Sequence, residues 1–185
     1  MARGHSELIP RAARLLAAGA LTGLIWALPH HVRAASFAPK DLQVLGRAIA
    51  FMLPPPAPDA IIAIAYVAGD AGSKRDADAI AALIGGGLQA GRAILRPKVI
   101  DINNLDTGGF HVVIAAAGAN GPRLNAAVRA ARALCVTTDI EAVRAGYCTM
   151  AITSEPRVEI VVNHAVAAAA SVDFATAFRM MIHEM

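Results

Sequence analysis

Two apolar runs in this chain lack the alternation of apolar and polar residues that marks a half-exposed strand. Residues 60–68 and 111–116 are almost entirely apolar, and a glycine-containing turn follows each run. Strands without polar alternation are typical of parallel sheets whose two faces are both covered. We therefore expect both runs to be buried strands of a central sheet, parallel to each other.

Apolar residues at helical spacing lie between and around these runs. Leu42, Leu45, Ile49 and Met52 follow that spacing, and the proline-rich residues 54–58 must end this first helix. The same patterns predict helices at residues 76–88, 123–133, 140–145 and from about 165 onward, and strands at 93–100, 134–138, 147–153 and 158–162. A proline inside the strand at 93–100 indicates an edge position.

Strands and helices that alternate in this way predict an α/β fold. The expected architecture is a three-layer sandwich, with a mostly parallel central sheet flanked by helices. The Ser-Glu-Pro-Arg sequence at residues 154–157 is typical of a turn between two strands, and it adds an antiparallel hairpin near the C-terminus. We expect one such domain, over residues 35–185.

The first 34 residues resemble a secretory signal peptide. Arg3, Arg11 and Arg14 form a basic start, and residues 15–28 form an apolar core of the usual length. The sequence Val-Arg-Ala at residues 32–34 then predicts cleavage before Ala35 and a periplasmic location. An N-terminal anchor that is not cleaved is the alternative.

The positive charge of the chain comes from this first segment. The 185 residues include 17 basic and 14 acidic side chains; residues 1–34 hold four of the basic and one of the acidic ones, which leaves 13 of each. A nucleic-acid-binding protein needs a basic patch that displaces counterions from phosphates. The charge balance therefore argues against a nucleic-acid partner.

The two cysteines, Cys135 and Cys148, are expected to form a disulfide. An exported domain meets an oxidising compartment, and an even number of cysteines can pair there. Both are expected as the second residue of neighbouring strands, which would bring their Cα atoms within bonding reach. Two unpaired thiols are the alternative.

No catalytic motif stands out in the sequence. The turn at residues 69–74 lacks the spacing of a phosphate-binding loop, and its Ser73 is expected to cap the helix that follows. His111, His164 and His183 are scattered, and no nucleophile or metal-ligand motif accompanies them. We therefore expect neither an enzyme nor a bound cofactor or metal.

The expected C-terminal helix carries a stripe of large apolar residues. Phe174, Phe178, Met181 and Ile182 recur at helical spacing. Such a stripe packs into the core, or part of it forms an exposed docking or homodimer face.

Several short motifs resemble the YfiR family over about residues 40–180. They lie at residues 51–54, 61–67, 69–70, 91–92, 111–114, 135–139, 145–146 and 157–163. Members of this family are exported proteins, and the best-known type represses a membrane-bound diguanylate cyclase by binding its periplasmic domain. The resemblance implies a repressor in cyclic-di-GMP signalling, and it points to Glu159 and Asn163 as partner-binding residues.

Two classes of function stay open from the sequence. The first is this exported regulatory protein, for which Glu159, Asn163, Phe174 and Phe178 are the candidate partner-binding residues. The second is a small-ligand-binding periplasmic protein built like half of a binding protein, with its site at the ends of the parallel strands. The candidate residues for that site are Asp70, Ser73, Asn120 and Asp139.

Overall fold

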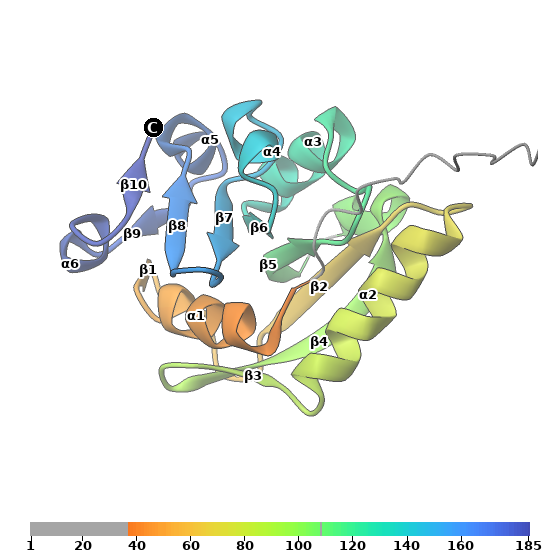
Figure 1. Ribbon diagram of the computed structural model, residues 1–185, viewed down its shortest axis with the longest axis horizontal. Helices are drawn as coiled ribbons and strands as arrows, with labels where there is room; N and C mark the ends of the chain where they lie inside the picture. The colour runs from red at the N-terminus through yellow and green to blue at the C-terminus, as the bar shows by residue number, and fades with distance from the viewer. Residues whose placement is uncertain (1–36, 108) are drawn as a thin grey trace, which may run out of the picture. The chain divides into compact units, whose positions relative to one another are not determined.

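The computed structural model describes residues 37–107 and 109–185, which form an α/β fold around an eight-stranded sheet (Figure 1). The strand order is β10-β8-β7-β6-β5-β2-β4-β3. The strands are β2 (Ile61–Tyr66), β3 (Leu88–Ala90), β4 (Ala93–Asp101), β5 (Phe110–Ala115), β6 (Leu134–Thr137), β7 (Met150–Thr153), β8 (Glu159–Val162) and β10 (His183–Glu184).

The central five strands, β4, β2, β5, β6 and β7, run parallel to one another. Strands β2 and β5 are neighbours, with Ile62 opposite Val112 and Ile64 opposite Ile114, and all four side chains are buried. This arrangement confirms the prediction from the two apolar runs. Strand β8 is antiparallel to β7 and forms the expected hairpin with it.

Helices cover the two faces of the sheet. On one face, α1 (Pro39–Ile49) and α2 (Ala71–Ile84) pack on the side chains of Ile62 and Ile64. On the other face, α3 (Pro122–Ala131), α4 (Ile140–Arg144) and the 3-10 helix η1 (Ile102–Thr107) pack on Ala63 and Ala65. Successive residues of β2 therefore serve opposite faces, and the sheet is covered on both sides, as the apolar runs indicated.

Strand β4 has the expected edge character over most of its length. The short strand β3 pairs with Ala93–Leu95 only, so β2 is the single strand that pairs with residues 96–101. Pro97 lies in this second part, where its missing N–H breaks no ladder. The helix predicted over residues 76–88 ends earlier, because Gly85, with φ of +59°, ends α2 after Ile84, and Leu88 begins β3 instead.

The start of α2 also differs from the prediction. The helix begins at Ala71, and Asp70 rather than Ser73 caps it: Asp70 Oδ1 accepts hydrogen bonds from the N–H groups of Gly72 at 2.7 Å and Ser73 at 3.1 Å. The Ser73 hydroxyl is buried and accepts from Val67 N at 3.0 Å. A carboxylate that precedes the first turn can reach two free N–H groups, so it takes the capping position.

The C-terminal region is not the continuous helix that the apolar stripe predicted. It divides into α5 (His164–Ala169), β9 (Asp173–Phe174), α6 (Thr176–Arg179) and β10. Strand β9 pairs antiparallel with β1 (Met52–Leu53), a segment that the sequence placed in the first helix. This pairing satisfies backbone groups that a helix would satisfy locally, and it brings Phe51, Phe174 and Phe178 together.

Among the described residues, no helix combines the length and the apolar character needed to cross a membrane. The signal peptide predicted at residues 1–34 lies outside the described residues.

Candidate functional site

The chain changes direction across the sheet between β2 and β5, and this point locates the candidate site. Strand β2 leads through α2 to β4 on one side, whereas β5 leads through α3 to β6 on the other. The loops that follow β2 and β5 therefore diverge toward opposite faces of the sheet. Ligands of doubly wound α/β proteins bind in the crevice that this divergence leaves at the carboxyl ends of the strands.

Little empty space remains in this crevice, and a side chain from the start of the described chain, Phe37, lines what is left. A cavity of only about 10 Å³ remains, lined by Phe37, Asp76, Ala115, Ala116, Ala117, Asn120, Thr137 and Thr138. That volume holds one water molecule at most. Phe37 is 3% exposed and belongs to the apolar cluster that contains Ile64 and Ile114. The buried Phe37 side chain thus forms part of the wall of this small cavity.

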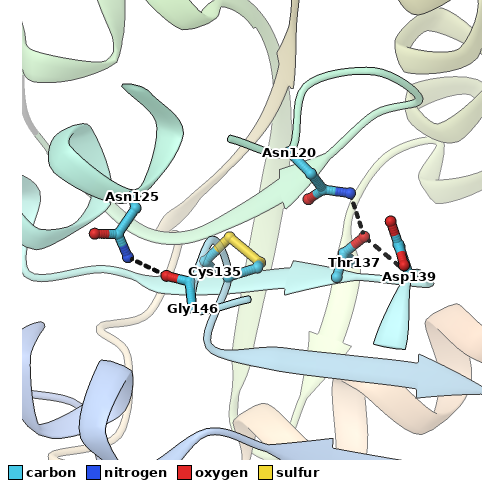
Figure 2. The surroundings of a disulfide bond; sticks show 7 residues. Asn120, Asn125, Cys135, Thr137, Asp139 and Gly146 are labelled. Atoms are coloured by element: carbon cyan, nitrogen blue, oxygen red, sulfur yellow. Dashed lines mark hydrogen bonds between the residues drawn. A yellow bond between two sulfur atoms is a disulfide. The ribbon is translucent and has the colours of Figure 1, made fainter. Parts of the chain in front are cut away.

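Polar groups meet on one side of this crevice (Figure 2). Asn120 Nδ2 donates to Thr137 Oγ1 at 3.1 Å, and the backbone N–H of Asp139 donates to the same oxygen at 3.1 Å. Asn120 Oδ1 is buried but accepts no hydrogen bond within the described part of the chain. A buried acceptor without a partner is costly, so this oxygen marks a place where a donor would be stabilised.

Carboxylates occupy the helix starts around the crevice. Asp70 caps α2, and Asp139 Oδ1 caps α4 by accepting from Glu141 N at 2.9 Å and Ala142 N at 3.2 Å. Asp76 Oδ2 accepts from Ala117 N at 2.8 Å and so ties α2 to the loop after β5. These carboxylates take the N–H groups that would otherwise attract an anion. Acceptors therefore gather at the starts of α2 and α4, whereas the start of α3 at Gly121 has no side-chain cap.

The four residues proposed for a ligand site are thus only partly brought together. Asn120 and Asp139 both hydrogen-bond Thr137. Asp70 lies beside the loop after β5, because a Cβ on Gly118 would stand 3.5 Å from Asp70 Oδ2. The Ser73 hydroxyl accepts a hydrogen bond from Val67 N, and Ser73 does not line the cavity.

The predicted cysteine pairing is confirmed. Cys135 and Cys148 are joined by a disulfide, with their Cα atoms 5.0 Å apart and both residues buried on the face covered by α3 and α4. Cys135 is the second residue of β6 as expected, but Cys148 lies two residues before β7 rather than inside it. The bridge closes the segment that carries α4, and Asn125 of α3 donates to Gly146 O at 2.8 Å in the same segment (Figure 2).

The residues proposed for partner binding do not form one exposed surface. Glu159 is the first residue of β8 and Asn163 follows its last, about 13 Å away at the usual rise of a strand. The Asn163 amide is engaged at both ends: Oδ1 accepts from Val166 N at 3.1 Å as the cap of α5, and Nδ2 donates to Val143 O at 3.0 Å. Asn163 therefore joins α5 to α4.

Phe174 and Phe178 belong to the core. They are 4% and 3% exposed, and the Phe178 ring centroid lies 5.4 Å from that of Phe51 and 5.1 Å from that of Phe174. The exposed apolar residues of this region are instead Met180, Met181 and Met185, at 84%, 65% and 48%. Of the proposed stripe, Met181 faces solvent and the two phenylalanines do not.

No local pattern in the sequence marks Phe37, Asp76 or Thr137, because each becomes notable only through residues distant in the chain. The same holds for a charged group near the C-terminus, where His164, Asp173, Arg179 and Glu184 line a cavity of about 310 Å³. His111 lies apart from this group, at the amino end of β5. Among the described residues, no group of three or more His, Cys, Asp or Glu side chains is arranged to hold a metal ion.

The fold defines this chain as a doubly wound α/β protein with a disulfide beside β6 and a filled crevice at its switch point. The sequence matches no protein-family model, and no curated protein is significantly similar to it.

Proposed function

We propose that this protein is an exported, non-enzymatic regulatory protein that represses a membrane diguanylate cyclase by binding its periplasmic domain. The resemblance to the YfiR family is the first support. Two of the similar segments, at 61–67 and 111–114, fall on the adjacent central strands β2 and β5, and a third, at 135–139, covers β6 and the α4 cap. The disulfide is compatible with an oxidising compartment.

The observation that carries the proposal is an exposed apolar patch beside a sheet edge. Met180 and Met181 lie between α6 and β10, and Met185 directly follows β10. Within the described residues β10 pairs only with β8, so its other edge is open. Exposed methionines adapt to a partner surface, and an open strand edge offers backbone groups to a second chain. We name Met180, Met181, Met185 and the outer edge of β10 the methionine surface.

Contacts with neighbouring elements hold this surface in place. Phe178, in α6, stacks on Phe51 next to β1, and Arg179 pairs with Asp173 of β9. The backbone of Met185 donates to Val162 O at 3.0 Å, and His164 N donates to Met185 O at 3.1 Å. A surface that is ordered before binding loses less conformational entropy in a complex.

The test is a binding measurement between purified proteins. The periplasmic domains of the membrane diguanylate cyclases from the same genome are titrated with this protein, and calorimetry records binding. We expect one domain to bind, and the double variant Met180→Glu/Met181→Glu to bind it at least tenfold more weakly, about 1.4 kcal/mol. The two introduced carboxylates would lose their hydrating water in an apolar contact and would gain no partner in exchange.

Leu83→Glu is the matched control, because Leu83 is an exposed apolar residue at 47% on α2, away from the methionine surface. This variant should bind like the wild type. Binding that is lost in Leu83→Glu but kept in the methionine variant would place the interface elsewhere. If none of the cyclase domains binds, the proposed function is wrong. Light scattering of the protein alone tells whether a second copy of this chain covers the surface instead.

A further inference from the structure

We propose that the crevice between the carboxyl ends of β2, β5 and β6 binds a neutral, single-ring aromatic compound that carries a hydroxyl group, and that the Phe37 side chain occupies this site in the absence of the ligand. This inference goes beyond the regulatory function proposed above and does not depend on it.

The aromatic ring of the ligand is inferred from the residue that occupies the crevice. The Phe37 ring packs in the apolar cluster with Ile64, Ile114 and Val136, which lie on three neighbouring strands. Only about 10 Å³ stays empty around it. A site filled this closely by a phenyl group has room for one aromatic ring once Phe37 has left.

The hydroxyl group is inferred from Asn120. One end of this amide is bonded to Thr137, and the other, Oδ1, is buried without a partner in the described chain. The phenyl ring of Phe37 has no hydrogen-bond donor for this oxygen. A hydroxyl group both donates and accepts, so it satisfies either end of an amide.

The neutral charge of the ligand is inferred from the carboxylates. Asp76 lines the cavity, and Asp70 and Asp139 occupy the starts of α2 and α4 beside it. An anionic ligand would lie against the Asp76 carboxylate, which is part of the cavity wall. The site therefore discriminates against aromatic acids.

Phe37 can leave the crevice because little besides its ring holds it. Its backbone forms no hydrogen bond to another described residue, and the first backbone group tied to α1 is Ala38 N, which donates to Asp41 Oδ2 at 2.8 Å. Helix α1 starts at Pro39 and packs on β3 independently of Phe37, since Gly46 approaches the backbone of Gln89 closely. The ligand and Phe37 thus compete for one place.

The test compares three probes, phenol, toluene and benzoate, on the wild type and on Phe37→Ala by calorimetry. Removal of a large buried side chain leaves a cavity that a small aromatic molecule can fill. We expect Phe37→Ala to bind phenol at least tenfold more tightly than the wild type, because the competing ring is gone. It should also prefer phenol to toluene at least tenfold and should not bind benzoate.

Two further variants keep the test decisive. Phe174→Ala removes a similarly buried phenylalanine that packs on Phe178 and does not line the cavity with Asn120, and it should show no preference for phenol over toluene. Phe37→Ala/Asn120→Leu should lose the preference for phenol. If Phe37→Ala does not fold, Phe37→Leu, which keeps an apolar contact, takes its place.

Equal binding of phenol and toluene by Phe37→Ala would show an apolar void only and would overturn the proposal, as would the absence of phenol binding. The affinity of Phe37→Ala for the cyclase domain is measured separately, without phenol. That affinity depends on the methionine surface and not on the crevice, so failure of one proposal is distinguishable from failure of the other.

Discussion

Asp173 shows how a single exposed side chain can stabilise a segment that has little regular structure. Its carboxylate accepts from Phe174 N at 2.7 Å and pairs with Arg179 of α6. The hydrogen bond from the Phe174 backbone, then the one from Arg179, holds the pKa of Asp173 below its ordinary value of 3.8. This residue links β9 to α6, the two elements that replace the expected helix.

The lowered pKa of Asp173 predicts a pH-dependent contribution to stability. A carboxyl group whose pKa is lower in the folded than in the unfolded state stabilises the fold above 3.8, and this contribution disappears as the pH falls through the folded value. Asp173→Asn should therefore unfold at lower urea concentration than the wild type at pH 7. The difference should shrink as the pH falls below 3.8.

Glu155→Gln is the control for this measurement, because Glu155 forms another exposed ion pair, with Lys40 at 3.7 Å. It separates the loss of a surface charge from the loss of the Asp173 contacts. A difference between Asp173→Asn and the wild type that stays constant with pH would contradict the interpretation.

At the scale of elements, the segment between β6 and β7 is secured by covalent and polar links together. The disulfide joins the ends of the segment, and Asp139 caps α4 within it. Asn163, at the start of α5, donates a hydrogen bond to Val143 O of α4. Loss of one link leaves the others in place, so the segment should loosen without releasing the sheet.

The disulfide is expected to add stability chiefly by restricting the unfolded chain. The two cysteines are 13 residues apart, and the chain-entropy model gives about 3 kcal/mol as the upper value for a loop of this size. Cys135→Ala/Cys148→Ala should therefore lower the free energy of unfolding by up to about 3 kcal/mol. Alanine is chosen because both positions are buried and a serine hydroxyl would need a partner there.

Wild-type protein treated with a reducing agent is the comparison, since it loses the bond but keeps both sulfur atoms. Thiol titration of the denatured, unreduced protein gives a direct check. Two free thiols per chain would mean that the bridge does not form in the protein as isolated from cells.

At the scale of the whole molecule, cleavage of the predicted signal peptide would place the N-terminus of the mature chain close to Phe37 and the crevice. The predicted cleavage before Ala35 makes Phe37 the third residue of the mature protein. Mass spectrometry of the protein recovered from the periplasm should show a mature N-terminus at or near Ala35. Ala34→Trp should block processing, because cleavage requires a small residue at that position.

Intact Met1 on protein recovered from the soluble cytoplasm would contradict export. It would also remove the compartment argument for the disulfide, which thiol titration tests independently.

The sequence by itself determined the layered α/β fold, the buried parallel strands and the C-terminal hairpin, and it favoured the cysteine pairing. These features follow from patterns within short segments: the aliphatic runs at β2 and β5, the Ser-Glu-Pro-Arg turn, and Asp139 ahead of α4. Strand burial and capping depend on a residue and its near neighbours, so they can be inferred before any tertiary contact is known.

Only the tertiary structure decided how the C-terminal region folds and what fills the crevice. Strand β9 exists because β1, from the other end of the described chain, supplies its hydrogen-bond partners, and this pairing outweighs the helical spacing of Phe174 and Phe178. Phe37 likewise matches no pattern in the residues around it, yet it is buried and lines the small cavity near the carboxyl ends of β5 and β6. Pairing and burial between distant segments depend on the spatial order of the strands, and that order is a property of the assembled sheet.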